Sequence, residues 1–215
     1  MRVLIGQPVH EEGVHRLLKD IKANGAVDII IYPEGYLSNE KALEDACAIA
    51  KENNVMIITA YRKDNKDRAV IINSAGEKIL ERAKTSADEG AELNEPLYVN
   101  FQGMNIGYLL CMEILKGMRD LKRAGVHFDF IAHPIGVGMF SDEQFDMWIK
   151  EAKDIAKTYN TVIIGASHAD GSYRDCGVSI PISYCINSDG QPIYISKSDI
   201  RTRIVNLDTK ECIVV

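Results

Sequence analysis

The sequence predicts an α/β fold, an α-β-β-α sandwich in which two mixed sheets pack face to face with helices outside. Strand-like apolar runs alternate along the chain with segments whose apolar residues recur at helical spacing. The runs are rich in Ile and Val and nearly continuous, which indicates strands that are covered on both faces. Two short patterns also recur in the second half of the chain, which predicts pseudo-duplicated halves.

The recurring patterns are a strand end and a hairpin turn. Residues 28–33 (Asp-Ile-Ile-Ile-Tyr-Pro) match residues 129–134 (Asp-Phe-Ile-Ala-His-Pro), and residues 72–76 (Ile-Asn-Ser-Ala-Gly) match residues 186–190 (Ile-Asn-Ser-Asp-Gly). The two offsets differ, so a duplication requires an insertion. General similarity between unrelated βα units is the alternative. The expected unit is β-α-β-α-β followed by a hairpin.

In the first half, an apolar helical stripe over residues 14–21 ends near Gly25, a residue suited to a left-handed helix stop. Ser38 is expected to cap a second helix with a stripe over residues 43–50. The turn at residues 73–76 predicts a hairpin whose return strand ends at Lys84. The expected strands are residues 2–7, 28–32, 55–60, 69–72 and the return strand.

In the second half, residues 113–124 are expected to form a helix that stops at Gly125. Ser141 and Gln144 form a capping-box pattern before a long helix that reaches Tyr159. The residues around 186–190 predict a second hairpin. The expected strands are residues 105–110, 128–132, 162–166 and the return strand 193–196.

Composition narrows the class of protein. The 215 residues are 46% hydrophobic and 26% charged, which suits a single globular domain over 1–215. A net charge of −6 without a basic run argues against a nucleic-acid partner, and the apolar runs are too short to cross a membrane. The N-terminus has no signal-peptide pattern, and the five cysteines form no Cys-x-x-Cys pair. These features predict a reducing, cytoplasmic location and no structural metal.

Three polar residues stand where predicted strands end. Glu34 follows the strand 28–32, Lys84 ends the hairpin return strand, and Cys111 follows the run 106–110 and precedes a helix. A thiol at a helix N-terminus is expected to have a lowered pKa. An acid, a cation and a thiol that meet at strand ends can form a covalent catalytic site.

The contexts of these residues resemble the nitrilase, or carbon-nitrogen hydrolase, superfamily. The segments that carry the resemblance are Tyr32-Pro-Glu-Gly-Tyr36, Glu81-Arg-Ala-Lys84 and Gly107-Tyr-Leu-Leu-Cys-Met-Glu113, followed by His133-Pro-Ile-Gly136 and Trp148. No single motif is specific, but their order spans nearly the whole chain. The resemblance implies a nitrilase-like α-β-β-α sandwich and a single carbon-nitrogen hydrolase domain.

The resemblance also implies roles. Glu34 would be the general base, Cys111 the nucleophile, and Lys84 the cation beside the oxyanion, with the backbone N–H of Met112 as a second donor. The expected reaction is hydrolysis of a small amide to an acid and ammonia or an amine, through a thioester acyl-enzyme and without a cofactor. A nitrile is the other expected substrate class, and a homodimer is the expected assembly.

A second glutamate of the family supports the lysine, and here Glu89, Glu92 and Glu95 all compete, with Glu89 favoured slightly. The interval from Lys84 to Cys111 is short for the family, and Glu113 is expected to orient the loop. Further substrate-binding candidates lie after the strand 128–132. They are His133, Ile135 and Gly136.

Two rival functions are open. The chain could be a catalytically silent ligand-binding or regulatory member of the same fold. Alternatively, Cys176 and His168, which share a segment rich in Asp and Arg, could form a Cys-His pair or a metal site. Each of the three predicted site residues also has a structural reading, a buried thiol for Cys111, an exposed turn for Glu34 and a surface lysine for Lys84.

Overall fold

The computed structural model of the chain describes residues 1–88, 90–170 and 177–215. The first half contains two helices, α1 (His15–Asn24) and α2 (Glu40–Asn53). The second half contains a 3₁₀ turn at Cys111–Glu113, followed by α3 (Ile114–Ala124) and α4 (Asp142–Tyr159). The first five strands are β1 (Arg2–Ile5), β2 (Ile29–Ile31), β3 (Met56–Lys63), β4 (Lys66–Ile72) and β5 (Lys78–Ala83). The later strands are β6 (Tyr98–Phe101), β7 (Met104–Tyr108), β8 (Phe130–Pro134), β9 (Val162–Ala166), β10 (Ile182–Ile186), β11 (Pro192–Lys197), β12 (Arg203–Asn206) and β13 (Cys212–Val214).

The strands form two mixed sheets with matching topology. One sheet has the order β13-β12-β1-β2-β3-β4-β5 and the other has the order β11-β10-β9-β8-β7-β6. In the first, β1, β2 and β3 are parallel, and β4 and β5 return antiparallel. In the second, β7, β8 and β9 are parallel, and β10 and β11 return antiparallel. The two halves therefore repeat one topology, as the sequence pattern predicts.

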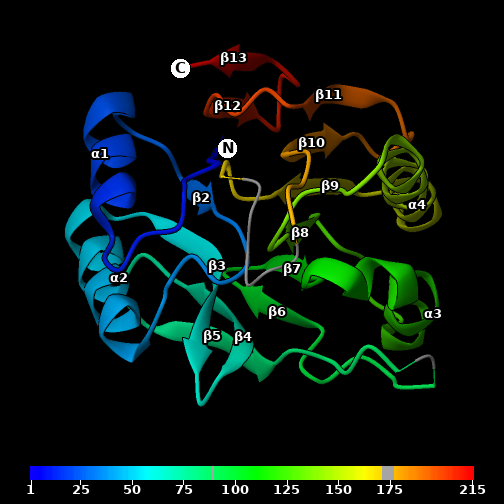
Figure 1. Ribbon diagram of the computed structural model, residues 1–215, viewed down its shortest axis with the longest axis horizontal. Coiled ribbons are helices and arrows are strands. Elements are labelled where there is room, and N and C mark those ends of the chain that lie inside the picture. The colour runs from blue at the N-terminus through cyan, green and yellow to red at the C-terminus, as the bar shows by residue number, and fades with distance from the viewer. Residues whose placement is uncertain (89, 171–176) are drawn as a thin grey trace.

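The sheets lie between two helical layers, so the predicted α-β-β-α sandwich is confirmed (Figure 1). Helices α1 and α2 cover one sheet, and α3 and α4 cover the other. A buried apolar cluster between the sheets combines residues of both, among them Ile31 and Ile58 of one sheet and Ala132 and Ile164 of the other. Strands covered on both faces explain the continuous Ile and Val runs of the sequence.

Two details of the first half differ from the sequence prediction. The side chain that caps α2 belongs to Asn39, whose oxygen accepts a hydrogen bond from the Ala42 N–H at 2.9 Å. Ser38, the predicted cap, instead donates to the Glu12 carbonyl. Strands β3 and β4 are also joined by a tight hairpin, because Asp64 and Asn65 both adopt positive φ angles.

Three strands were not predicted. Strand β6 pairs with β7 at one sheet edge, and β12 and β13 extend the other sheet beyond β1. Within the described residues, no helix has both the length and the apolar character needed to cross a membrane.

Candidate active site

The side chains of Glu34, Lys84 and Cys111 meet in one place. The Lys84 ammonium lies 2.6 Å from Glu34 Oε1, and the Cys111 thiol is close enough to the Glu34 carboxylate for the two groups to shift each other's pKa. The Glu34 side chain is 5% exposed and the Lys84 side chain 31% exposed. The three groups come from the ends of β2, β5 and β7, which belong to both sheets. The fold therefore brings together the acid, the cation and the thiol named from the sequence.

Glu34 is fixed on the far side from Lys84 by backbone contacts. Its N–H donates to the Ile135 carbonyl at 3.3 Å, and its own carbonyl accepts from His168 Nε2 at 2.9 Å. Gly136 lies against its carboxylate, where a Cβ atom on residue 136 would be 2.7 Å from Glu34 Oε2. A Cβ atom at that position would therefore displace the carboxylate.

Cys111 has a backbone conformation that is unusual for its residue type. Its φ of 52° lies in the left-handed region, which costs a residue with a Cβ atom about 1–2 kcal/mol. His133 fixes this turn, because its Nε2 lies 2.8 Å from the Cys111 carbonyl while its Nδ1 lies 2.5 Å from the Tyr184 hydroxyl. The Gly136 backbone N–H donates to the thiol sulfur. The turn therefore holds the sulfur toward Glu34.

The resting thiol is protonated at neutral pH. Burial raises the pKa of Cys111 to about 12, and the Glu34 charge adds to this effect, while Lys84 and the Gly136 N–H oppose it. The lowered thiol pKa expected from the sequence is therefore wrong, since desolvation and a neighbouring carboxylate outweigh the helix N-terminus. A base is needed to remove the proton during attack.

Glu34 has the properties of such a base. Burial raises the pKa of Glu34 above its usual value, and the Lys84 charge offsets part of that effect. Burial lowers the pKa of Lys84, but the charges of Glu34 and Cys111 outweigh burial, so that its pKa lies above the usual value. Lys84 is therefore a stable cation beside the carboxylate and the sulfur.

Glu113 joins the two segments that carry Lys84 and Cys111. Its carboxylate forms a two-pronged ion pair with Arg82, at 2.8 Å to Nη1 and 2.5 Å to Nη2. The same carboxylate accepts from the Thr85 N–H at 2.9 Å and from the Leu110 N–H at 2.8 Å. Burial alone would raise the pKa of Glu113, but the Arg82 hydrogen bonds and charge hold it below its usual value. Glu113 is thus ionised, and both of its carboxylate oxygens accept hydrogen bonds.

Glu92 and Glu95, two of the three glutamates expected to support Lys84, have other partners. Glu92 pairs with Arg123, and Glu95 accepts from the Leu97 N–H at 3.0 Å. Glu89, the slightly favoured candidate, lies outside the described residues. The supporting acid that sequence reasoning missed is Asp67 of β4, which is buried and interacts electrostatically with both Lys84 and Glu34.

The acid was expected between Lys84 and Cys111, whereas Asp67 precedes Lys84 in the chain. The antiparallel pairing of β4 and β5 brings it close, and the Lys84 N–H donates to the Asp67 carbonyl at 3.0 Å. The signal for Asp67 in the sequence would have been a charged residue placed opposite Lys84 in the predicted hairpin.

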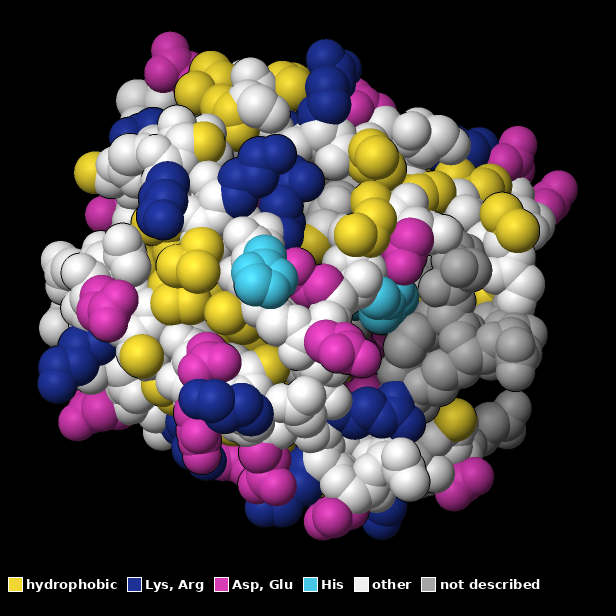
Figure 2. All heavy atoms as spheres, turned by 60° about the vertical axis from the view of Figure 1, so that its left-hand side comes forward, with side chains coloured by type: hydrophobic (Ala, Val, Ile, Leu, Met, Phe, Trp, Pro, Cys, Tyr) yellow, Lys and Arg dark blue, Asp and Glu magenta, His cyan; other side chains and the backbone are white. Residues whose placement is uncertain are grey.

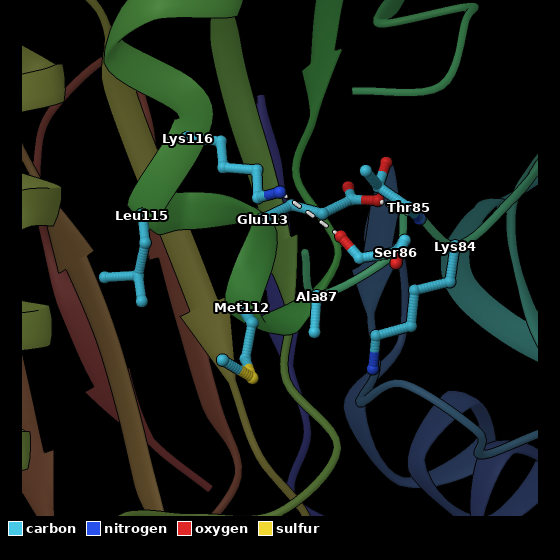
Figure 3. Close-up of a pocket in the computed structure, with 8 residues that line it drawn as sticks. All are labelled: Lys84, Thr85, Ser86, Ala87, Met112, Glu113, Leu115 and Lys116. Atoms are coloured by element: carbon cyan, nitrogen blue, oxygen red, sulfur yellow. Dashed lines mark hydrogen bonds between the residues drawn. The ribbon is translucent and has the colours of Figure 1, made fainter. Parts of the chain in front are cut away.

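The remaining candidates have different surroundings. Met112 is 48% exposed and lines a cavity of about 530 Å³ together with Lys84 (Figure 3). His133 and Ile135 are fully buried. The Ile135 N–H donates to the Ala166 carbonyl at 2.9 Å, so it is already occupied. Gly136 is in direct contact with Glu34 and Cys111.

A group of His10, His168 and Asp170 is the one cluster in the described residues whose donor atoms could approach a metal ion. The two histidine rings are stacked 3.6 Å apart, so their nitrogens do not converge on one point. His168 places both nitrogens near the Pro8 and Glu34 carbonyls, and His10 Nδ1 lies 2.7 Å from Asp170. The geometry fits a hydrogen-bonded support behind Glu34 better than a metal site. Cys176, the residue expected to pair with His168 in one rival function, lies outside the described residues.

The described surface agrees with the charge pattern of the sequence. On the face shown in Figure 2, Lys and Arg side chains are interspersed with Asp and Glu, and the described atoms form no continuous basic area.

The fold is that of known carbon-nitrogen hydrolases. A carbon-nitrogen hydrolase from Helicobacter pylori G27 superposes with a TM-score of 0.78 at 11% identity, covering 98% of this chain and 90% of that chain. An amidase from Nesterenkonia sp. gives a TM-score of 0.74 at 16% identity, covering 95% and 89%. A variant of the Nesterenkonia sp. AN1 amidase, with the acetamide moiety of fluoroacetamide added covalently at the active-site cysteine, gives 0.73 at 15% identity and covers 95% and 89%. No family model and no curated protein matches the sequence.

Proposed function

We propose that this protein is a carbon-nitrogen hydrolase of the nitrilase superfamily that cleaves non-peptide amides through Glu34, Lys84 and Cys111. The observation that carries the proposal is the contact of one carboxylate with both an ammonium, at 2.6 Å, and a thiol, in a buried site. The site lies in a fold shared with carbon-nitrogen hydrolases and with an amidase that takes a covalent group on its active-site cysteine.

The first half-reaction forms a thioester. The thiol proton passes to Glu34 as the Cys111 sulfur attacks the amide carbon, and the carbonyl electron pair moves to the oxygen. Lys84 and the Met112 backbone N–H stabilise the oxygen charge, and losing one such donor costs on the order of 100- to 1,000-fold in rate. When the tetrahedral intermediate collapses, the C–N bond breaks and the nitrogen leaves with the proton returned by Glu34.

The second half-reaction releases the acid. Glu34 is again a carboxylate at this point. It accepts a proton from a water molecule while the water oxygen attacks the thioester carbon. The C–S bond breaks, and the sulfur recovers its proton from Glu34. The raised pKa values of the thiol and the carboxyl group suit a shared proton that moves between them in each half-reaction.

Amide hydrolysis is the reaction proposed here, with nitriles as the other substrate class. We also propose that the protein acts as a homodimer in the cytoplasm. A silent ligand-binding protein of the same fold would need the cavity but would not need the thiol.

The test is turnover of a panel of primary amides and nitriles, read by ammonia release. Wild-type protein should release ammonia, whereas Cys111→Ala should lose turnover entirely and keep its far-UV circular dichroism. Cys212→Ala, which removes a partly buried thiol on β13, is the matched control and should retain wild-type activity. Full activity in Cys111→Ala would overturn the assignment of the nucleophile.

A further inference from the structure

The cavity beside Lys84 is built from two chain segments. Residues 84–87, after β5, form one wall, and residues 112–116, at the start of α3, form the other (Figure 3). Its volume of about 530 Å³ lies within the range of small-molecule sites. Lys84 reaches its edge, so a molecule in the cavity would lie next to the proposed reacting groups.

The charged residues that line this cavity already have ion-pair or hydrogen-bond partners. Lys84 pairs with Glu34, and Glu113 pairs with Arg82, where both side chains are at most 2% exposed. The Lys116 ammonium contacts the carbonyls of Ser86, Asp88 and Ala91. A carboxylate on a ligand would therefore lose water and find these donors already engaged.

Apolar side chains make up most of the accessible part of the walls. Met112, in the 3₁₀ turn, is 48% exposed, and Leu115, in the first turn of α3, is 42% exposed. Ala87 faces them from the other wall (Figure 3). Large apolar side chains left exposed in a concave site favour an apolar ligand group that covers them.

We propose that the substrate is an uncharged amide bearing an alkyl or aryl group, and that Leu115 helps to select it. This inference rests on the proposed hydrolase function. The apolar group lies over Met112 and Leu115 while the carboxamide reaches Lys84 and Cys111. Because Leu115 touches the ligand away from the reacting atoms, its loss affects long substrates and spares short ones.

The test compares kcat/KM for acetamide, hexanamide and adipamate, which is hexanamide with a carboxylate at the far end. Hexanamide should exceed both others by at least about tenfold. Leu115→Asn should lower kcat/KM for hexanamide by about fivefold or more and leave acetamide within about twofold. Met147→Gln, at a similarly exposed position on α4, is the control and should change neither.

Equal or better turnover of adipamate, or an unchanged hexanamide preference in Leu115→Asn, would overturn the substrate assignment alone. If no amide is hydrolysed, the hydrolase proposal fails, and binding to Cys111→Ala by calorimetry then tests the cavity. Hexanamide should bind at least about tenfold more tightly than acetamide. Equal affinities, or no binding of either amide, would overturn the inference.

A different observation points to a positioning role for Glu113. One carboxylate accepts from the N–H of Thr85, which follows Lys84, and from the N–H of Leu110, which precedes Cys111. Arg82 orients that carboxylate and also donates to the Tyr108 and Pro96 carbonyls. We infer that the Arg82–Glu113 pair sets the separation of the cation and the sulfur.

Glu113→Gln tests this role, because glutamine keeps the shape of the side chain and loses the charge. The expected result is a fall of at least about tenfold in kcat with KM within about threefold, since substrate contacts remain while the reacting groups lose alignment. Asp120→Asn is the matched control. Asp120 is also a buried acid of α3 that binds an arginine and a loop N–H, but it touches neither segment.

Comparable loss of kcat in Asp120→Asn, or an unchanged kcat in Glu113→Gln, would overturn the positioning role. If Glu113→Gln does not fold, Arg82→Lys gives the second reading, because lysine keeps the charge and loses the two-pronged geometry. Arg82→Lys should also lower kcat more than it changes KM. An unchanged kcat there would contradict the inference equally.

Discussion

At the scale of single residues, the site combines a protonated thiol with a buried base. Burial raises the pKa of Cys111 to about 12, so in the proposed mechanism the thiolate forms only as Glu34 removes its proton. Burial raises the pKa of Glu34 and the Lys84 charge opposes that effect, and in the proposed mechanism the ammonium also faces the position where negative charge develops. The turn that carries the sulfur is strained, because the φ of Cys111 lies in the left-handed region.

The pH dependence follows from Glu34. Its raised pKa means that the inactive, protonated form persists to a higher pH than for an ordinary glutamate, and reactivity rises as pH passes through that value. Lys84→Met removes a charge that lowers this pKa, so the acid limb should move to higher pH. The measurement is the rate of Cys111 labelling by fluoroacetamide between pH 4 and pH 9, with Lys116→Met as control. A limb that moves to lower pH would contradict this account.

At the scale of elements, the site depends on how strand ends approach one another. The end of β2 meets the residues after β8 so closely that the Glu34 carboxylate lies against Gly136. The two sheets thus each contribute part of one site. The acid and the lysine come from one sheet, and the thiol and Gly136 come from the other.

Gly136→Ala tests this close approach. The new Cβ would lie 2.7 Å from Glu34 Oε2, so the carboxylate must move away from the sulfur or from Lys84. We expect kcat to fall by at least about tenfold while the protein stays folded. Gly90→Ala is the control, because a Cβ there meets nothing within 4 Å. Unaltered kcat in Gly136→Ala would show that the carboxylate position is not critical.

Sequence patterns predicted the strands and helices whose apolar residues form a clear run or stripe. The strands around Ile30, Ile58 and Ile131 were found because both of their faces are covered. Strands β6, β12 and β13 are only three or four residues long, so they carry a weaker apolar signal. Strands β6 and β13 are also partly exposed sheet edges, and β12 begins with a charged residue, Arg203. Their positions depend on pairing with strands that are distant in the chain. The periodicity of the local sequence carries no information about such pairing.

The same limit applies to the site. Glu34, Lys84 and Cys111 could be named because each follows a recognisable strand. Asp67 and Arg82 could not, because their roles arise from pairing across a hairpin and from an ion pair over 31 residues of chain. The raised thiol pKa likewise depends on burial and on Glu34, and neither is visible in the local sequence.

At the scale of the whole molecule, the two halves are expected to unfold together. They share the apolar cluster between the sheets, and the Tyr108 hydroxyl of β7 donates to the Thr59 carbonyl of β3 at 2.5 Å. Neither sheet could keep its inner face buried alone. This shared core is the physical basis for a single domain.

Urea unfolding tests that expectation. The only tryptophan, Trp148, lies buried on α4 in the second half, so its fluorescence follows that half while far-UV circular dichroism follows both. The two curves should coincide in one transition. Tyr108→Phe should destabilise the protein by about 1–2 kcal/mol and lower both midpoints together. Two separate transitions would show that the halves are independent units.

The central claim is that Glu34 and Lys84 activate Cys111 over the other thiols. Intact mass and peptide mapping after treatment with fluoroacetamide test it most directly. We predict one acetamide group per chain, on Cys111, despite its 8% exposure, and much slower labelling in Glu34→Leu. Labelling of the more exposed Cys47 and Cys212 with Cys111 unmodified would contradict the claim.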